Sequence, residues 1–263
     1  MIRTYALRVG SLFGVPLMID ATFAINVLIM ATVIPTVVVG GPLACGIWIA
    51  CAYASLITHE LAHVGVSTLN GVKVSEIRLH VLGATGVPET EQPNPNAEIL
   101  TAAAGPIMSL TLGFLLSIPL LHLAFSGGDL GKVMPKQPLL MDLGLISAFN
   151  VLIAIFNLLP LYPMDGGRIL RGLLTKIFGN LGRATTACAS ITIVASFAIL
   201  VRGGYEIAVH RDLASLIPII LGVALGNYAL REIDKDGLTK ISRMLRRRGT
   251  SATATTKEEE TTE

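Results

Sequence analysis

Long uncharged stretches alternate with short charged segments along this chain of 263 residues, and the alternation predicts helices that cross a membrane. A helix needs about 20 predominantly apolar residues to cross the hydrocarbon core of a bilayer. The expected fold class is therefore an all-α polytopic membrane protein with about six transmembrane helices. Stretches of suitable length predict these helices at residues 21–39, 43–68, 97–125, 139–161, 184–201 and 213–230.

Two segments outside these helices have the composition of β-strands. Residues 9–20 are rich in strand formers and carry Gly14 and Pro16, which predicts a short hairpin at the membrane surface. Residues 72–77 and 79–87 predict a second membrane-associated hairpin or small sheet. Non-helical backbone is tolerated at membrane depth only where protein or water covers it, so we expect this hairpin beside an active-site cavity. A plain cytoplasmic loop is the alternative.

The pattern divides the chain into four parts. Residues 1–20 form an N-terminal surface segment, and residues 21–231 form the membrane core. Residues 232–249 mix apolar and basic positions and are expected to lie on the anionic inner leaflet. Residues 250–263 are almost entirely Thr, Ala, Ser and Glu, so they cannot form a core and are expected to be disordered.

The composition supports a membrane protein, because 52% of the residues are hydrophobic and 14% are charged, against about 25% charged in soluble domains. The positions of Lys and Arg then predict the orientation. With the N-terminus in the cytoplasm, sixteen of the 20 Lys and Arg residues lie on the cytoplasmic side. We therefore expect a multi-pass protein of a prokaryotic cytoplasmic membrane, with both termini facing the cytoplasm. Four residues fall on the opposite side: Lys132, Lys136, Arg202 and Arg211.

His59, Glu60 and His63 form a His-Glu-x-x-His pattern in the last third of the second predicted helix. The two histidines leave the same helix face one turn apart and can share one zinc ion, while Glu60 can hold an attacking water. Ionisable side chains are costly inside a bilayer and mark functional sites there by default. The alternative is a satisfied histidine pair without metal. We expect one Zn²⁺ per chain.

Small and polar residues recur at four-residue intervals on two of the predicted helices. On the second helix they extend the histidine pair into a narrow polar stripe, and on the third they predict a face for close helix packing. The stripe on the second helix contains Cys51, Ser55, His59, His63 and Ser67, and the row on the third contains Thr101, Gly105, Ser109 and Gly113.

A catalytic zinc site takes three protein ligands and leaves one position for water, so a third donor must come from elsewhere in the chain. Asp165 is the best candidate, because Pro160 and Pro163 break the preceding helix. Gly166 and Gly167 then let the backbone turn tightly enough to direct the carboxylate inward. The competing candidates are the remaining histidines: His80, His122 and His210.

Two separated motifs resemble the site-2 protease family of intramembrane zinc metalloproteases. They are His59-Glu60-Leu-Ala-His63 and Asn157-Leu-Leu-Pro160-Leu-Tyr-Pro163-Met-Asp165-Gly166-Gly167. Two further family signatures are matched by Phe13-Gly14-Val15-Pro16 and Ala104-Gly105-Pro106, so the resemblance spans residues 10–171.

The resemblance implies that His59, His63 and Asp165 bind Zn²⁺ and that Glu60 is the catalytic acid and base. It implies that Asn157 lies near the site and helps to hold the substrate or the oxyanion. The implied activity is hydrolysis of peptide bonds in or near transmembrane segments, as in regulated intramembrane proteolysis, with the site toward the cytoplasm. The expected partners are a transmembrane protein substrate and the lipid bilayer, and no nucleic acid.

The chain departs from the family pattern at two positions, with Asp20 where many members have His and Ser109 where Asn often follows Ala-Gly-Pro. The PDZ insertion and the CBS domain of some members have no counterpart, so we expect the membrane core alone. A membrane metal-ion transporter and a zinc-bound scaffold without catalysis are the alternative functions.

Overall fold

The computed structural model describes residues 6–37, 41–80, 83–92, 94–133, 137–211 and 215–234. The chain divides into two compact units. The first comprises Met1–Leu159 and Met164–Ile169, and the second comprises Pro160–Pro163 and Leu170–Glu263. The predicted tail at 250–263 and nearly all of the predicted basic segment at 232–249 lie outside the described residues.

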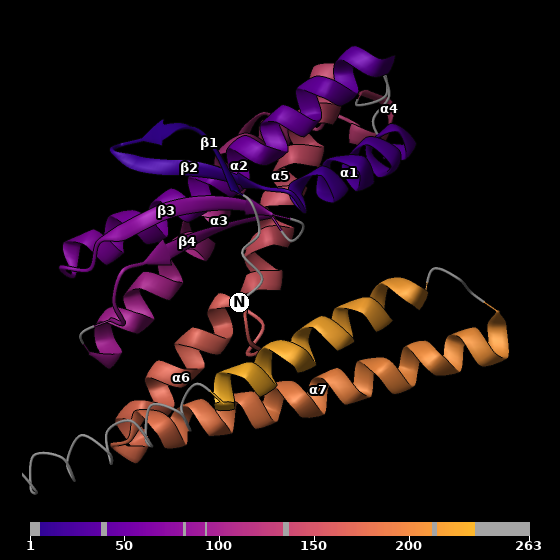
Figure 1. Ribbon diagram of the computed structural model, residues 1–263. Coiled ribbons are helices and arrows are strands. Elements are labelled where there is room, and N and C mark those ends of the chain that lie inside the picture. Colours follow the sequence, from indigo (N-terminus) through magenta and orange to yellow (C-terminus); the bar gives the residue numbers. More distant parts are fainter. Residues whose placement is uncertain are drawn as a thin grey trace, which may run out of the picture. The chain divides into compact units, whose positions relative to one another are not determined.

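The described part of the first unit contains four strands and five complete helices (Figure 1). In chain order they are β1 (Ala6–Leu12), β2 (Val15–Asp20), α1 (Phe23–Val37), α2 (Gly41–Leu69), β3 (Val74–His80), β4 (Gly83–Pro88), α3 (Pro95–Phe125), α4 (Leu130–Val133) and α5 (Pro138–Asn157). Helix α6 (Asp165–Phe178) begins in the first unit and continues into the second. The second unit also contains α7 (Leu181–His210) and a helix over Leu216–Asp234.

The four strands form one sheet in the order β1-β2-β3-β4. The two outer pairs are antiparallel hairpins, and β2 and β3 pair in parallel between Leu17–Ile77 and Ile19–Leu79. The two hairpins expected from the sequence therefore combine, although nothing local in either one predicts this pairing. The sheet packs against α2, with β4 making most of the contact, and leaves β1 and β4 as its edge strands.

The predicted strand boundary at residue 78 is wrong, since β3 runs without interruption through Arg78 to His80. The guanidinium group of Arg78 forms an ion pair with the carboxylate of Glu76, two residues away on the same side of the strand. Its charge is therefore neutralised within the strand and does not end it.

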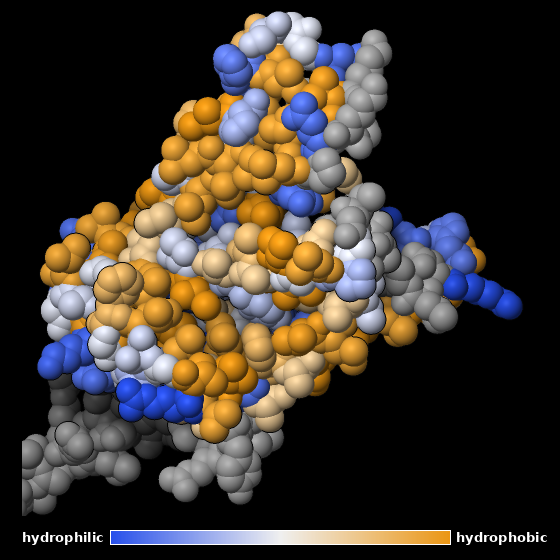
Figure 2. Space-filling model, turned by 90° about the horizontal axis from the view of Figure 1, so that it is seen from above, coloured by the Kyte–Doolittle hydropathy of each residue, from blue (hydrophilic) through white to orange (hydrophobic). Residues whose placement is uncertain are grey.

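Five helices among the described residues are long and apolar enough to cross a membrane: α2, α3, the Leu139–Asn157 part of α5, α7 and Leu216–Asp234. Helix α1, at the position of the first predicted span, has 15 residues. Hydrophobic side chains cover much of the visible surface in Figure 2, and α3 exposes Leu100, Ile107 and Phe114. Such exteriors suit lipid rather than water. The chain is an integral membrane protein.

Helix ends differ from the predicted spans where local chemistry decides them. Helix α5 ends at Asn157, four residues before the predicted 161, because Pro160 cannot continue the hydrogen-bond pattern. Helix α7 extends to His210, nine residues beyond the predicted 201. It passes Arg202, whose charge pairs with Glu206 one turn further along at 2.6 Å.

Helix α3 begins with a side-chain cap. The Asn94 Oδ1 atom accepts a hydrogen bond from the Ala97 N–H at 2.9 Å, and Pro95 occupies the first helical position. Both features favour a helix start at this point. Helix α3 then packs against α2 and α5, so its inner face is directed at the helix that carries the histidines.

Candidate metal centre

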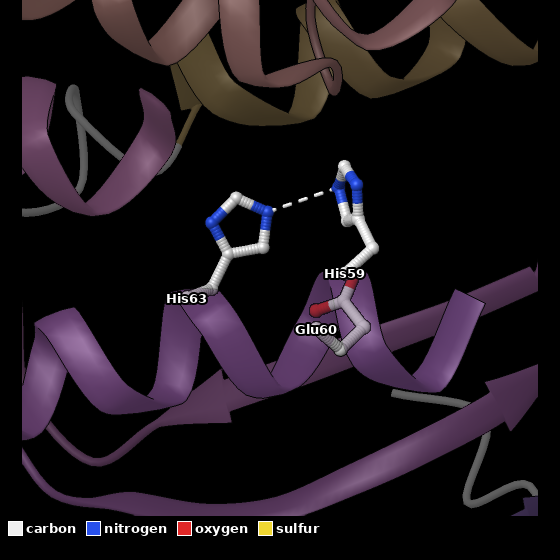
Figure 3. A group of neighbouring side chains, drawn as sticks. All are labelled: His59, Glu60 and His63. Carbon is white, nitrogen blue, oxygen red and sulfur yellow. Dashed lines mark hydrogen bonds between the residues drawn. The ribbon is translucent and has the colours of Figure 1, made fainter. Parts of the chain in front are cut away.

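The two histidines of α2 lie on one helix face, and their rings approach each other (Figure 3). The His59 Nε2 and His63 Nε2 atoms are 3.1 Å apart. The residues are 3% and 7% exposed, so neither ring is solvated. Two ring nitrogens therefore converge on a single point within a hydrophobic helix bundle.

Asp165, the first residue of α6, completes the group. Its Oδ2 atom lies 3.3 Å from His59 Nε2 and 3.2 Å from His63 Nε2. We call these three atoms the donor triangle. Gly166 allows the approach, because a Cβ atom there would collide with the carbonyl oxygens of Leu158 and Leu159. The broken helix and following glycines in the sequence thus deliver this carboxylate to the histidines.

The donor triangle fits a zinc ion. A tetrahedral zinc with bonds of about 2.0–2.1 Å keeps its ligand atoms about 3.3 Å apart, close to the observed edges of the triangle. Two imidazole nitrogens and one carboxylate oxygen also form a donor set typical of catalytic zinc. Three protein donors leave a fourth position for water or substrate.

Glu60 lies beside the histidines on α2 (Figure 3). Its Oε2 atom accepts a hydrogen bond from the Gly86 N–H of β4 at 2.9 Å. A carboxylate oxygen of Glu60 lies within 4.8 Å of ring nitrogens of both His59 and His63. The β3–β4 hairpin, expected from the sequence beside the site, therefore contacts it directly.

Helix α3 supports both imidazoles on the side of each ring away from the donor triangle. The His59 Nδ1 atom is 2.9 Å from Ser109 Oγ, and the His63 Nδ1 atom is 2.7 Å from the Thr101 carbonyl oxygen. Gly105 lies between these contacts, and a Cβ atom there would collide with Nε2 of both histidines. The row predicted as a packing face is thus also the outer support of the candidate metal centre.

The electrostatic surroundings keep Asp165 ionised. Burial acts to raise the pKa of its carboxyl group, whereas the charge of Arg168 acts to lower it, and the pKa lies below its usual value. Arg168 Nη1 lies 3.7 Å from Asp165 Oδ1, on the next turn of α6. The anionic form is the one that binds a metal.

Asn157 and the other histidines form hydrogen bonds or contacts outside the donor triangle or are exposed. The Asn157 Nδ2 group, at the end of α5, donates to the Ile153 carbonyl, and the residue is half-buried. His80 Nε2 is 2.7 Å from Thr85 Oγ1 within the hairpin. His122 is exposed on α3, and His210 lies 3.7 Å from Glu206 on α7.

Sequence reasoning missed the partners Ser109, Thr101 and Gly86. Ser109 and Thr101 both carried a signal, as polar positions in the four-residue row on α3, but that row was predicted only as a helix-packing face. Thr101 and Gly86 act through backbone groups, which any residue possesses, so residue identity does not reveal them. Asn150 was also missed, although it is fully buried on α5 and donates through Nδ2 to Ser55 Oγ at 2.9 Å.

Comparison with known proteins finds relatives of this chain. The model of peptidase family M50 matches residues 47–141 and 129–201. A zinc metalloprotease of Methanocaldococcus jannaschii is 30% identical over 71% of this chain and 50% of its own length. A protein of Synechocystis sp., whose name describes it as a zinc metalloprotease, is 32% identical over 66% of this chain and 45% of its own.

A solved structure, the site-2 protease from Methanocaldococcus jannaschii, has the same fold. It superimposes with a TM-score of 0.60 over 87% of this chain and 95% of that one, at 24% sequence identity. The chain spans about half the length of the curated relatives it matches. The family match covers the histidine motif, the α3 row and Asp165 together. This chain therefore belongs to peptidase family M50.

Proposed function

We propose that the chain is an intramembrane zinc metalloprotease that hydrolyses peptide bonds in or near the transmembrane segments of membrane proteins. The observation that carries the proposal is the donor triangle of His59, His63 and Asp165 with Glu60 beside it, inside a bundle of apolar helices. A membrane metal-ion transporter would use the same donors but has no use for a base held next to them. Family membership also favours hydrolysis.

Each residue of the site has its own proposed role in hydrolysis. His59, His63 and Asp165 would hold zinc, which when bound polarises a peptide carbonyl and acidifies a water molecule. Glu60 accepts the proton of the attacking water and passes it to the leaving amine. The hydrogen bond from the Gly86 N–H fixes one oxygen of the Glu60 carboxylate and leaves the other for proton transfer. Asn157, at the end of α5, is proposed to hold the substrate or the oxyanion.

The edge of β4 is the proposed place for the substrate backbone. Gly86 is paired with Ile77, yet its N–H donates to Glu60 and so points away from β3. Because successive N–H groups of a strand alternate in direction, the Ala84 N–H points to the same free edge. An unwound substrate needs replacement hydrogen bonds in the membrane, and an added strand along β4 would obtain them beside Glu60.

Replacing Glu60 with Gln tests the reaction. Glu60→Gln should lower cleavage by about 100-fold to 10,000-fold, because the base is lost, while zinc content stays at one per chain. Zinc is measured by elemental analysis, and cleavage by comparing membrane proteomes of cells that carry the wild-type chain or the variant. Single-span proteins should accumulate uncut with the variant. Glu206→Gln, a change of the same kind at a half-buried position on α7, serves as control. Identical proteomes for the wild type and Glu60→Gln would refute the proposed protease activity.

Two variants test the edge strand. Ala84→Pro removes an N–H from the free edge and should abolish cleavage while zinc content is kept. Ala84→Val keeps that N–H and should cleave like the wild type. Equal cleavage by both variants would show that the edge of β4 does not bind substrate.

The orientation is proposed from the distribution of positive charge, which places both termini and the metal centre toward the cytoplasm. Reporter fusions at the loop residues Gly127 and Gly179 test it. Gly127 should report the outer side and Gly179 the cytoplasmic side. The opposite result would reverse the assignment.

A further inference from the structure

The two histidines of the donor triangle are held by partners of different kinds. The His63 Nδ1 atom faces the carbonyl oxygen of Thr101, and the His59 Nδ1 atom faces the hydroxyl group of Ser109. The first partner belongs to the backbone, whereas the second is a side chain that substitution can remove.

The Thr101 carbonyl determines the state of His63. A carbonyl oxygen only accepts hydrogen bonds, so at 2.7 Å His63 Nδ1 must carry the proton. The neutral ring then has its lone pair on Nε2, the atom that lies in the donor triangle.

The Ser109 hydroxyl leaves His59 two possible states, because a hydroxyl both donates and accepts. If Ser109 donated to Nδ1, the proton of a neutral His59 would sit on Nε2, inside the donor triangle. If Ser109 accepts from the Nδ1–H at 2.9 Å, the His59 Nε2 lone pair joins those of His63 and Asp165. Only the second state places three donors on one metal ion.

We propose that Ser109 is a positioning residue, which accepts the Nδ1–H of His59 and so holds Nε2 as the metal-binding atom. Ser109 is completely buried, so no water can replace its hydroxyl group. Outer hydrogen bonds of this kind fix the ring orientation of a metal-binding histidine and increase its basicity. The inference rests on the proposed metal ligands but concerns a residue that binds neither metal nor substrate.

The test measures how quickly zinc is lost. Zinc-loaded protein in detergent is mixed with excess chelator, and release is followed with a zinc-sensitive dye. Ser109→Ala should release zinc about 10-fold to 100-fold faster than the wild type. A cobalt-substituted sample should show a shifted visible absorption band, because the His59 ring is free to reorient.

Ser147→Ala is the matched control. Ser147 is also buried, and its Oγ donates to the Gly113 carbonyl of α3 at 2.7 Å, one turn beyond Ser109. The recorded hydrogen bond of Ser147 does not involve either histidine. Its loss should leave zinc release and the cobalt spectrum unchanged. Ser109→Cys changes only the hydroxyl oxygen, to a sulfur that is a weak acceptor, and it should also speed release. It decides the question if the alanine variant does not fold.

The measurements distinguish a failure of the proposed zinc ligands from a failure of the proposed role of Ser109. A wild-type chain that binds no zinc would refute the proposed ligands themselves. Full zinc content in the wild type, with equal release from Ser109→Ala, Ser109→Cys and Ser147→Ala, would refute the role of Ser109 alone. Equal acceleration by Ser147→Ala would reduce Ser109 to a general packing role.

Discussion

Helices α2 and α7 both carry buried polar residues at four-residue intervals, yet these residues form different kinds of contact. On α2 the hydrogen bonds lead to other elements, for example from His59 to Ser109 on α3 and from Asn150 on α5 to Ser55. On α7 the Thr192 Oγ1 group donates to the carbonyl of Cys188 in its own helix and accepts from the Tyr162 N–H. The α7 stripe consists of Cys188, Thr192 and Ser196.

The difference shows that spacing alone does not define a site. On α7 the Thr192 hydroxyl bonds to its own helix and to the segment before α6, whereas on α2 the histidines meet a second helix, α3, whose groups contact their Nδ1 atoms. A stripe becomes a candidate reaction centre when ionisable groups from separate elements converge, as Asp165 does with His59 and His63.

The largest expected effect is the loss of Asp165, the charged donor that α6 brings to the histidines of α2. Asp165→Asn replaces a carboxylate by a neutral amide and should weaken zinc binding by more than about 100-fold, beyond the loss of an outer contact. Zinc per chain after dialysis against a chelator measures this. The acidic control on α7, Glu206→Gln, should keep its zinc. A fully loaded Asp165→Asn variant would remove this residue from the donor set.

The next largest effect is expected from filling the space between α2 and α3. Gly105→Ala puts a methyl group where Nε2 of both histidines lie, so the rings must move and zinc content should fall at least 10-fold. Gly65→Ala on α2 meets nothing within 4 Å and should bind zinc normally. Equal zinc content in both variants would show that α3 does not confine the site.

Removing a buried hydroxyl group from α7 should lower the stability of the protein without changing zinc binding. Thr192→Val keeps the side-chain shape but leaves the buried Tyr162 N–H without its hydroxyl acceptor, which should cost about 1–3 kcal/mol of unfolding free energy. Thermal unfolding in detergent measures the loss, and the zinc release rate should not change. Faster release would link the α7 stripe to the metal centre.

The smallest effect is expected one turn before His59. Ser55→Ala removes the acceptor of Asn150 Nδ2, which keeps its bond to the Ile146 carbonyl, so stability should fall by about 1 kcal/mol. Zinc release should stay at the wild-type rate. Rapid zinc release from this variant would show that Ser55 also supports the metal centre, contrary to the prediction.

The sequence predicted the local parts of the molecule well. The apolar lengths and the paired histidines both depend on residues within a few positions of each other. The sheet was less predictable, because the parallel pairing of β2 with β3 joins segments about 60 residues apart. The helix ends at Asn157 and His210 depended on competing local signals, and proline decided only the first.

By itself the sequence determined that the chain has membrane-spanning helices and that His59 and His63 share one helix face, and through family resemblance it predicted Asp165 as the third donor. Only the tertiary structure decided what surrounds that centre: the Thr101 carbonyl, the Ser109 hydroxyl, the gap at Gly105 and the Gly86 N–H. Helical periodicity is a local property and can be read from adjacent residues. Which face of α3 meets α2, and at which height, results from the packing of whole helices, so the partners that orient the histidines emerge only from the fold.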